Sequence, residues 1–139
     1  MSKQKIHFIA GIWRSGTTLM KEVLGMKPEV KVFPEHMIAL NNLKCTNRFT
    51  ESKSTMLNNV LNNPDFVHFA EPNSYKLKED FARAERFEEG ILACYNACLI
   101  EAETIELFID KNPIYSYYLP ELLELFPDAK FVFIYRNPY

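Results

Sequence analysis

The sequence has few cysteines, and their number and spacing exclude a common class of small secreted proteins. The three residues are Cys45, Cys94 and Cys98, an odd number that matches no disulfide framework. We therefore expect a reducing, intracellular compartment. Cys94 and Cys98 are four residues apart and could share one helix face. Because no histidine or second cysteine pair accompanies them, we interpret them as buried small side chains and not as metal ligands.

The sequence also lacks an excess of either charge and any long apolar run. Its 16 basic and 18 acidic side chains leave a formal net charge of -2, which excludes a global field that would attract nucleic acid or an anionic membrane. The apolar run before Arg14 is too short for a signal peptide or a membrane span. We expect a cytoplasmic protein without nucleic acid or membrane partners, in which anion binding is local.

Short apolar segments alternate with amphipathic ones along the chain. The segments predicted as strands are 5–11, 29–35, 105–111 and 130–136. The segments predicted as helices are 17–26, a long helix over 79–103 with Gly90 as its weak point, and 120–126. This alternation predicts right-handed βαβ units, and hence an α/β fold with a mostly parallel sheet flanked by helices. A length of 139 residues predicts a single domain, 1–139.

The middle of the chain is less regular. Residues 36–63 are polar and rich in asparagine, although 36–43 and the apolar pairs near 56–61 have helical spacing. Residues 62–74 contain two prolines and several turn-forming residues, so they are predicted as an irregular surface connection.

The segment GIWRSGTT, residues 11–18, has the glycine spacing of a phosphate-binding loop, G-x-x-x-x-G-K-[ST]. Thr17 stands where that loop has its lysine, and Arg14 is the only cation in the segment. The loop joins a predicted strand to a predicted helix, so its free amides and the hydroxyls of Ser15 and Thr18 can donate to anionic oxygens. A plain strand-to-helix turn would explain the glycine spacing alone, but not RSGTT directly after an apolar strand.

Two stretches of the sequence resemble a known family. FIAGIWRSGTTLM, residues 8–20, resembles the phosphosulfate-binding loop of the sulfotransferases that use 3'-phosphoadenosine 5'-phosphosulfate (PAPS), in particular the branch with Arg-Ser-Gly-Thr-Thr. LFPDAKFVFIYRNPY, residues 125–139, is similar to the strand and loop that bind the 3'-phosphate of the donor. The resemblance leaves 40–104 unmatched. It implies a P-loop NTPase-like sulfotransferase fold and sulfuryl transfer from PAPS to a hydroxyl or amine, with no metal required.

The resemblance also implies which residues bind the donor. Arg14 matches the basic residue that bridges the leaving phosphate and the sulfuryl group, and a fixed guanidinium stabilises such developing charge. Arg136, which we expect at the tip of a buried strand, resembles the arginine that pairs with the 3'-phosphate. The implied donor-binding residues are Arg14, Ser15, Gly16, Thr17, Thr18 and Arg136.

The implied catalytic residues are Arg14, Glu35 and Lys111. Glu35 matches the glutamate that several enzymes of this branch, including those acting on protein tyrosine, use as the catalytic base. His36 is the alternative base, although we favour a solvated loop position for it. Lys111, in IDKNP, matches a family lysine that stabilises the leaving group. Glu35 could also be a surface carboxylate at a strand end, although we favour the functional role. Without the resemblance, Lys111 would be interpreted equally well as a surface lysine that precedes a helix.

The sequence departs from the family in two places. Trp13 replaces a proline that is common before the basic residue, and the family continues well beyond the position of Tyr139. We therefore expect a sulfotransferase domain that is incomplete at its C-terminus, with reduced or no activity alone. A homo-oligomer or a missing C-terminal segment would cover its sheet.

Two alternative functions and the acceptor stay open. The alternatives are a P-loop small-molecule kinase, which the missing lysine at Thr17 argues against, and a non-catalytic nucleotide-binding remnant. Residues 36–78 are expected to shape the acceptor pocket, and their composition is compatible with a small-molecule, glycan or peptide acceptor.

Overall fold

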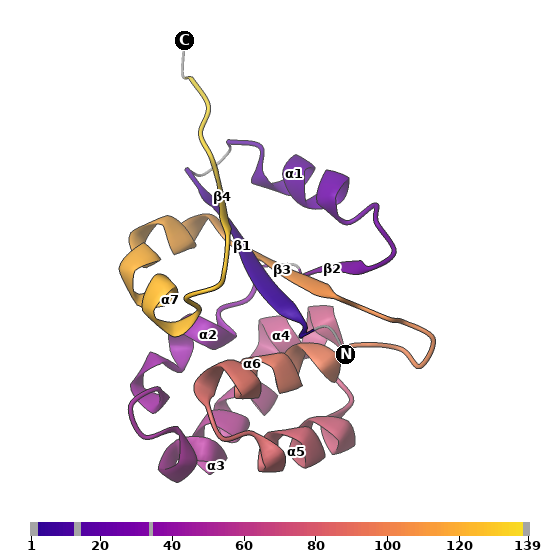
Figure 1. Cartoon of the computed structure of the whole chain (residues 1–139), viewed down its shortest axis with the longest axis vertical. Helices are drawn as coiled ribbons and strands as arrows, with labels where there is room; N and C mark the ends of the chain where they lie inside the picture. The colour runs from indigo at the N-terminus through magenta and orange to yellow at the C-terminus, as the bar shows by residue number, and fades with distance from the viewer. Residues whose placement is uncertain (1–2, 13–14, 34, 138–139) are drawn as a thin grey trace. The chain divides into compact units, whose positions relative to one another are not determined.

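The structure is a computed structural model that describes residues 3–12, 15–33 and 35–137. The backbone divides into two compact units (Figure 1). The sheet unit consists of Met1–Glu35 and Ala102–Tyr139, and the helical unit consists of His36–Glu101. The helical unit is therefore inserted in the sequence between the second and third strands. The expectation of a single domain stays a prediction.

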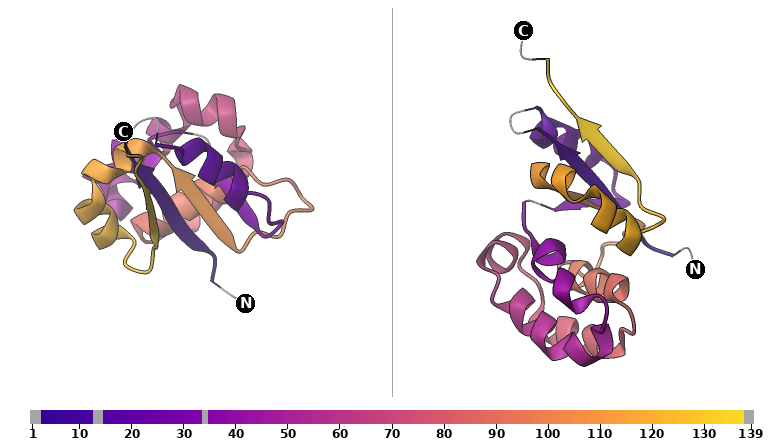
Figure 2. Two further views of the ribbon diagram at one scale, coloured as in Figure 1. Left: turned by 90° about the horizontal axis from the view of Figure 1, so that it is seen from above. Right: turned by 90° about the vertical axis from the view of Figure 1, so that its left-hand side faces the viewer.

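The described strands of the sheet unit form one parallel sheet in the order β2-β3-β1-β4. The left view of Figure 2 shows three of these strands, β4, β1 and β3, side by side. The strands are β1 Lys5–Gly11, β2 Val30–Phe33, β3 Leu107–Lys111 and β4 Phe131–Ile134. The predicted α/β fold with a parallel sheet is confirmed. Each strand arises where the sequence predicts it, and the last three are shorter than their apolar runs.

Helices of the sheet unit cover both faces of the sheet. They are α1 Thr17–Leu24, the 3-10 helix η2 Pro113–Tyr117 and α7 Leu119–Leu125. On one face the fully buried ring of Phe8 lies 5.4 Å from the ring of Tyr115 and 5.3 Å from that of Phe126. Successive side chains of a strand point to opposite faces of the sheet. The helices η2 and α7 therefore lie on the face to which Phe8 points, and α1 lies on the other face.

The last strand is less buried than its sequence suggests. Arg136 was expected at the tip of a buried strand, but Val132 is 38% exposed and Phe133 is 48% exposed. The physical reason is that β4 is an edge strand in the part of the chain that the structure describes, so only β1 pairs with it. The expectation that the strand is buried is therefore wrong.

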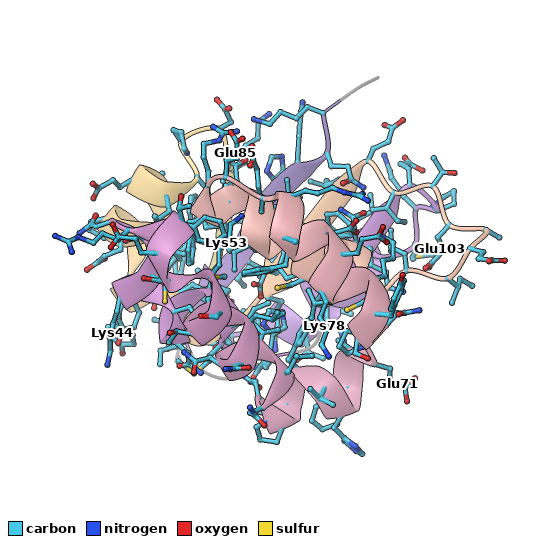
Figure 3. All side chains as sticks on the ribbon, turned by 90° about the horizontal axis from the view of Figure 1, so that it is seen from below. Lys44, Lys53, Glu71, Lys78, Glu85 and Glu103 are labelled. Carbon is cyan, nitrogen blue, oxygen red and sulfur yellow. The ribbon has the colours of Figure 1, made fainter. Side chains whose placement is uncertain are left out.

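The helical unit consists of short helices packed around their own apolar core. They are α2 Ile38–Asn41, η1 Leu43–Cys45, α3 Phe49–Leu61, α4 Pro64–Ala70, α5 Ser74–Arg83 and α6 Phe87–Asn96. Phe66, Leu77 and Ile91 are fully buried in this core. Charged side chains such as Lys44 and Glu71 point away from the helices (Figure 3). Within the described ranges, no helix is both long enough and apolar enough to cross a membrane.

The prediction of one long helix over 79–103 is wrong, because the segment forms parts of α5 and α6 with a break between them. Ala84 has an extended backbone, with ψ of 136°. The Glu89 carboxylate accepts hydrogen bonds from the amides of Glu85 and Arg86, at 2.8 and 3.3 Å, and so closes a capping box at the start of α6. The helical periodicity continues across this break, but the capping interaction starts a new helix.

The prediction of an irregular connection over 62–74 is also wrong, since α4 lies within it. The Oδ1 of Asn63 accepts a hydrogen bond of 3.0 Å from the amide of Phe66, and Pro64 occupies the first turn. An asparagine followed by proline satisfies the N-terminal requirements of a helix as well as those of a turn. The same pair of residue types therefore favours two different structures.

Candidate functional site

The phosphate loop, residues 11–18, connects the end of β1 to the start of α1, as predicted. Gly16 precedes the first residue of the helix and has φ of 103°, in the left-handed region that favours glycine. Trp13 and Arg14 lie outside the described residues, so the roles assigned to Arg14 stay predictions.

Gly11 allows the loop to approach β4 closely. A β-carbon at this position would lie 2.3 Å from the carbonyl oxygen of Ile134 and 3.0 Å from the Oγ of Ser15. The backbone of β4 therefore excludes any side chain here. Gly11 is the last residue of β1 and pairs with Ile134, so the loop starts at the carboxyl edge of the sheet beside the end of β4.

Two hydroxyl residues of the loop are buried. Ser15 is 9% exposed, and its Oγ has no hydrogen-bond partner among the described residues. Thr17 is 4% exposed and starts α1. An unsatisfied buried hydroxyl costs about 1–3 kcal/mol, so this position favours a ligand that supplies an acceptor oxygen. The loop has the chemistry of a site for an anion.

Three residues that the sequence analysis singled out separately meet beside the loop. The Nζ of Lys111, at the end of β3, donates a hydrogen bond of 3.3 Å to the Oγ1 of Thr18. The same Nζ forms an ion pair with the Oε1 of Glu35, which lies just after β2. We call this group the Lys111 cluster. The carboxyl ends of neighbouring parallel strands share one edge of the sheet, and this geometry brings the three side chains together.

Burial differs sharply within the Lys111 cluster. The side chain of Lys111 is 6% exposed, whereas that of Glu35 is 43% exposed. The ammonium group is thus held inside the protein by its partners, and the carboxylate can reach a molecule that approaches from solvent. A cation next to the phosphate loop and an accessible carboxylate can support transfer of an anionic group to an acceptor that loses a proton.

A second polar pair, which the sequence analysis missed, lies close enough to Glu35 to interact with it electrostatically. Asp110 and Tyr115 are both fully buried, and the Tyr115 hydroxyl is hydrogen-bonded to the Asp110 carboxylate. Burial, followed by the negative charges of Asp110 and Glu35, raises the pKa of Tyr115 well above its ordinary value. Tyr115 is therefore a neutral donor. The available signal was an acidic residue inside the apolar run LFIDK.

The structure corrects the interpretation of His36. We favoured a solvated loop position, but the residue is 1% exposed and belongs to the helical unit. Its ring makes edge contacts with Phe66 and Tyr95, with centroid distances of 5.4 and 5.8 Å. Its Nδ1 accepts a hydrogen bond of 3.4 Å from the amide of Ile38. Aromatic packing in the helical core explains why a histidine next to a strand end is buried.

The remaining sequence predictions concern Arg136 and the cysteines. Arg136 follows β4 and is exposed, and its role at the 3'-phosphate stays a prediction. Cys94 is buried and Cys98 is half-buried, with the Cys98 Sγ donating to the Cys94 carbonyl at 3.3 Å. Across the described part of the chain, no three histidine, cysteine or acidic residues gather in a group that could hold a metal ion.

The sequence of this chain is similar to those of known proteins. A model of the Sulfotransferase family matches residues 7–139. An omega-hydroxy-beta-dihydromenaquinone-9 sulfotransferase of Mycobacterium bovis is 28% identical over 162 aligned residues, covering 95% of this chain and 42% of the relative, and the Mycobacterium tuberculosis protein gives the same values. A protein-tyrosine sulfotransferase of Drosophila melanogaster is 27% identical over 131 residues, covering 94% and 23%. The chain thus spans less than half the length of these relatives.

Proposed function

The chain belongs to the sulfotransferase family, and from that premise we propose that it transfers a sulfuryl group from PAPS to a hydroxyl or amine acceptor. The observation that carries the proposal is the Lys111 cluster beside the phosphate loop. It combines a buried cation, an exposed carboxylate and a loop hydroxyl at the carboxyl edge of a parallel sheet, where ligands of such folds bind.

The described residues fit the donor. The buried Ser15 hydroxyl and the amides at the start of α1 would hold the 5'-phosphosulfate, together with Thr17 and Thr18. Arg14 would add a guanidinium to this site, and Arg136 would pair with the 3'-phosphate. PAPS, when bound, supplies the sulfuryl group, whose bond to the 5'-phosphate breaks as the acceptor attacks the sulfur.

The residues of the Lys111 cluster have complementary roles in this proposal. Glu35 accepts the proton that the acceptor hydroxyl or amine loses. Lys111 donates hydrogen bonds to the phosphate oxygens on which negative charge develops, and its burial makes that interaction stronger than it would be in water. Thr18 holds the ammonium group at the loop while it does so.

The acceptor is proposed from the names of the relatives. One is named for a hydroxylated dihydromenaquinone and another for protein tyrosine, so both act on a hydroxyl group. We therefore propose an alcohol or phenol, on a small molecule, glycan or peptide, as the acceptor class. The proposal also includes three predictions from the sequence analysis. They are a cytoplasmic location, which the cysteines suggest, a reaction that needs no metal, and the absence of nucleic acid and membrane partners.

Calorimetric titration with 3'-phosphoadenosine 5'-phosphate (PAP), with and without magnesium, tests the donor site. We expect a dissociation constant of about 1–100 μM. It should be independent of magnesium and raised about tenfold or more by Arg14→Ala and by Arg136→Ala, since each removes a charged hydrogen-bond donor to a phosphate.

The matched control for that titration is Arg48→Ala, which removes an exposed arginine of the helical unit and should leave PAP affinity unchanged. Magnesium-dependent binding of ATP in place of PAP would instead support the kinase alternative. Failure of the wild-type chain to bind PAP would contradict the proposed function.

Transfer itself is tested with radiolabelled PAPS and a panel of three acceptors: para-nitrophenol, a long-chain primary alcohol and a tyrosine-containing peptide. Label in any of these products supports the enzyme. Binding of PAP without transfer to any acceptor supports the non-catalytic alternative for this chain.

A further inference from the structure

The ammonium group of Lys111 already binds two side chains of the protein. Its described partners are Thr18 Oγ1 and Glu35 Oε1, and both belong to the proposed site. An ammonium group has three donors and no acceptor. With only 6% of the side chain exposed, Lys111 depends on protein partners or a ligand, and not on bulk water, to satisfy these donors.

This arrangement conflicts with the working roles of the two charged residues. A carboxylate that is paired with an ammonium group is a weaker base, because the pairing stabilises its ionised form. An ammonium group held by a carboxylate is likewise less available to a ligand phosphate. The ion pair between Lys111 and Glu35 therefore occupies both groups that the reaction needs.

Resting on the proposed function, we propose that Lys111 changes partner when the donor binds. Its Nζ leaves Glu35 for the 5'-phosphate of the donor, while Thr18 keeps it at the loop. The carboxylate of Glu35 is then free to take the acceptor proton. Binding of the donor thus makes the Glu35 carboxylate available as a base. The donor must therefore bind before the acceptor reacts.

The geometry of the cluster allows this exchange without a change of fold. The lysine side chain is a flexible four-carbon stem, so its ammonium group can move while β3 stays in place. Thr18 lies on α1 at the phosphate loop, and Glu35 lies beyond the end of β2. The phosphate and the carboxylate therefore compete for one cation from two sides.

The other charged or titratable groups described near Glu35 do not offer it a replacement cation. Tyr115, on η2, is a neutral donor to Asp110, and Asp110 is itself acidic. Once Lys111 leaves, neither of these two groups takes its place as a partner of the Glu35 carboxylate.

A double-mutant cycle on PAP affinity tests the exchange without requiring turnover. Because the amide of Glu35→Gln keeps the shape but not the charge, this variant should bind PAP about five- to tenfold more tightly than the wild type. Lys111→Met should bind about tenfold more weakly, since a cation to phosphate is lost. In the Lys111→Met background, Glu35→Gln should change the affinity by less than about twofold.

The cycle separates the exchange from simple charge repulsion. If Glu35→Gln tightens binding equally in both backgrounds, the carboxylate merely repels the ligand and the exchange is wrong. Unchanged or weaker binding by Glu35→Gln in the wild-type background also overturns it. Failure of the wild-type chain to bind PAP contradicts the proposed function itself, and is thereby distinguishable from failure of the exchange.

Two controls complete the design. Glu22→Gln removes an exposed carboxylate of α1 outside the cluster and should leave PAP affinity within about twofold of the wild type. Thermal melts by circular dichroism identify any variant that does not fold. Lys111→Gln replaces Lys111→Met in the cycle if the apolar side chain prevents folding.

Discussion

Replacing Glu35 by glutamine is expected to lower the rate of sulfuryl transfer by about two to four orders of magnitude. The amide has nearly the shape of the carboxylate but cannot accept the proton that the acceptor loses. The measurement is the initial rate with radiolabelled PAPS and the best acceptor of the panel. Because the same variant should bind PAP at least as tightly as the wild type, loss of turnover with retained binding distinguishes a chemical defect from unfolding.

Two further variants make the Glu35 prediction specific. Glu124→Gln, which changes an exposed residue of α7, should keep the wild-type rate within about twofold. His36→Gln tests the alternative base. If the histidine variant folds and loses transfer while Glu35→Gln retains most of its rate, the assignment of the base to Glu35 is wrong.

Substitution of Gly11 by alanine is expected to destabilise the chain by about 3 kcal/mol. The added β-carbon would lie 2.3 Å from the carbonyl oxygen of Ile134. A backbone atom cannot rotate out of the way as a side chain can, so β1 and β4 must separate beside the phosphate loop. Thermal unfolding followed by circular dichroism should show a midpoint lowered by about 10 °C, and PAP binding should be lost with it.

Gly25→Ala is the matched control for this effect. Gly25 ends α1 with φ of -74°, which alanine also adopts, and its β-carbon would lie 3.2 Å from the Lys21 carbonyl oxygen. A change below about 1 kcal/mol is expected for this variant. If Gly11→Ala unfolds at the same temperature as Gly25→Ala, the close approach of β4 does not constrain the loop.

Several parts of the fold could be predicted from local sequence signals. The apolar run before Gly11 forms a strand that is buried on both faces, because β1 is a central strand of the parallel sheet, and the glycine spacing after it forms the loop. The same type of signal failed at Glu89, where a side chain caps a new helix within a continuous helical period. It failed again at Pro64, where one residue type serves both a turn and a helix start.

The sequence by itself determined the family, the parallel α/β architecture and the separate motifs that contain Thr18, Glu35 and Lys111. Only the tertiary structure decided that these motifs form one cluster, that His36 is buried elsewhere and that Asp110 binds Tyr115. The physical reason is the range of the interactions. Composition and periodicity report on neighbours along the chain, whereas Lys111 meets partners 76 and 93 positions away. Those contacts depend on the strand order, which brings distant strand ends to one edge of the sheet.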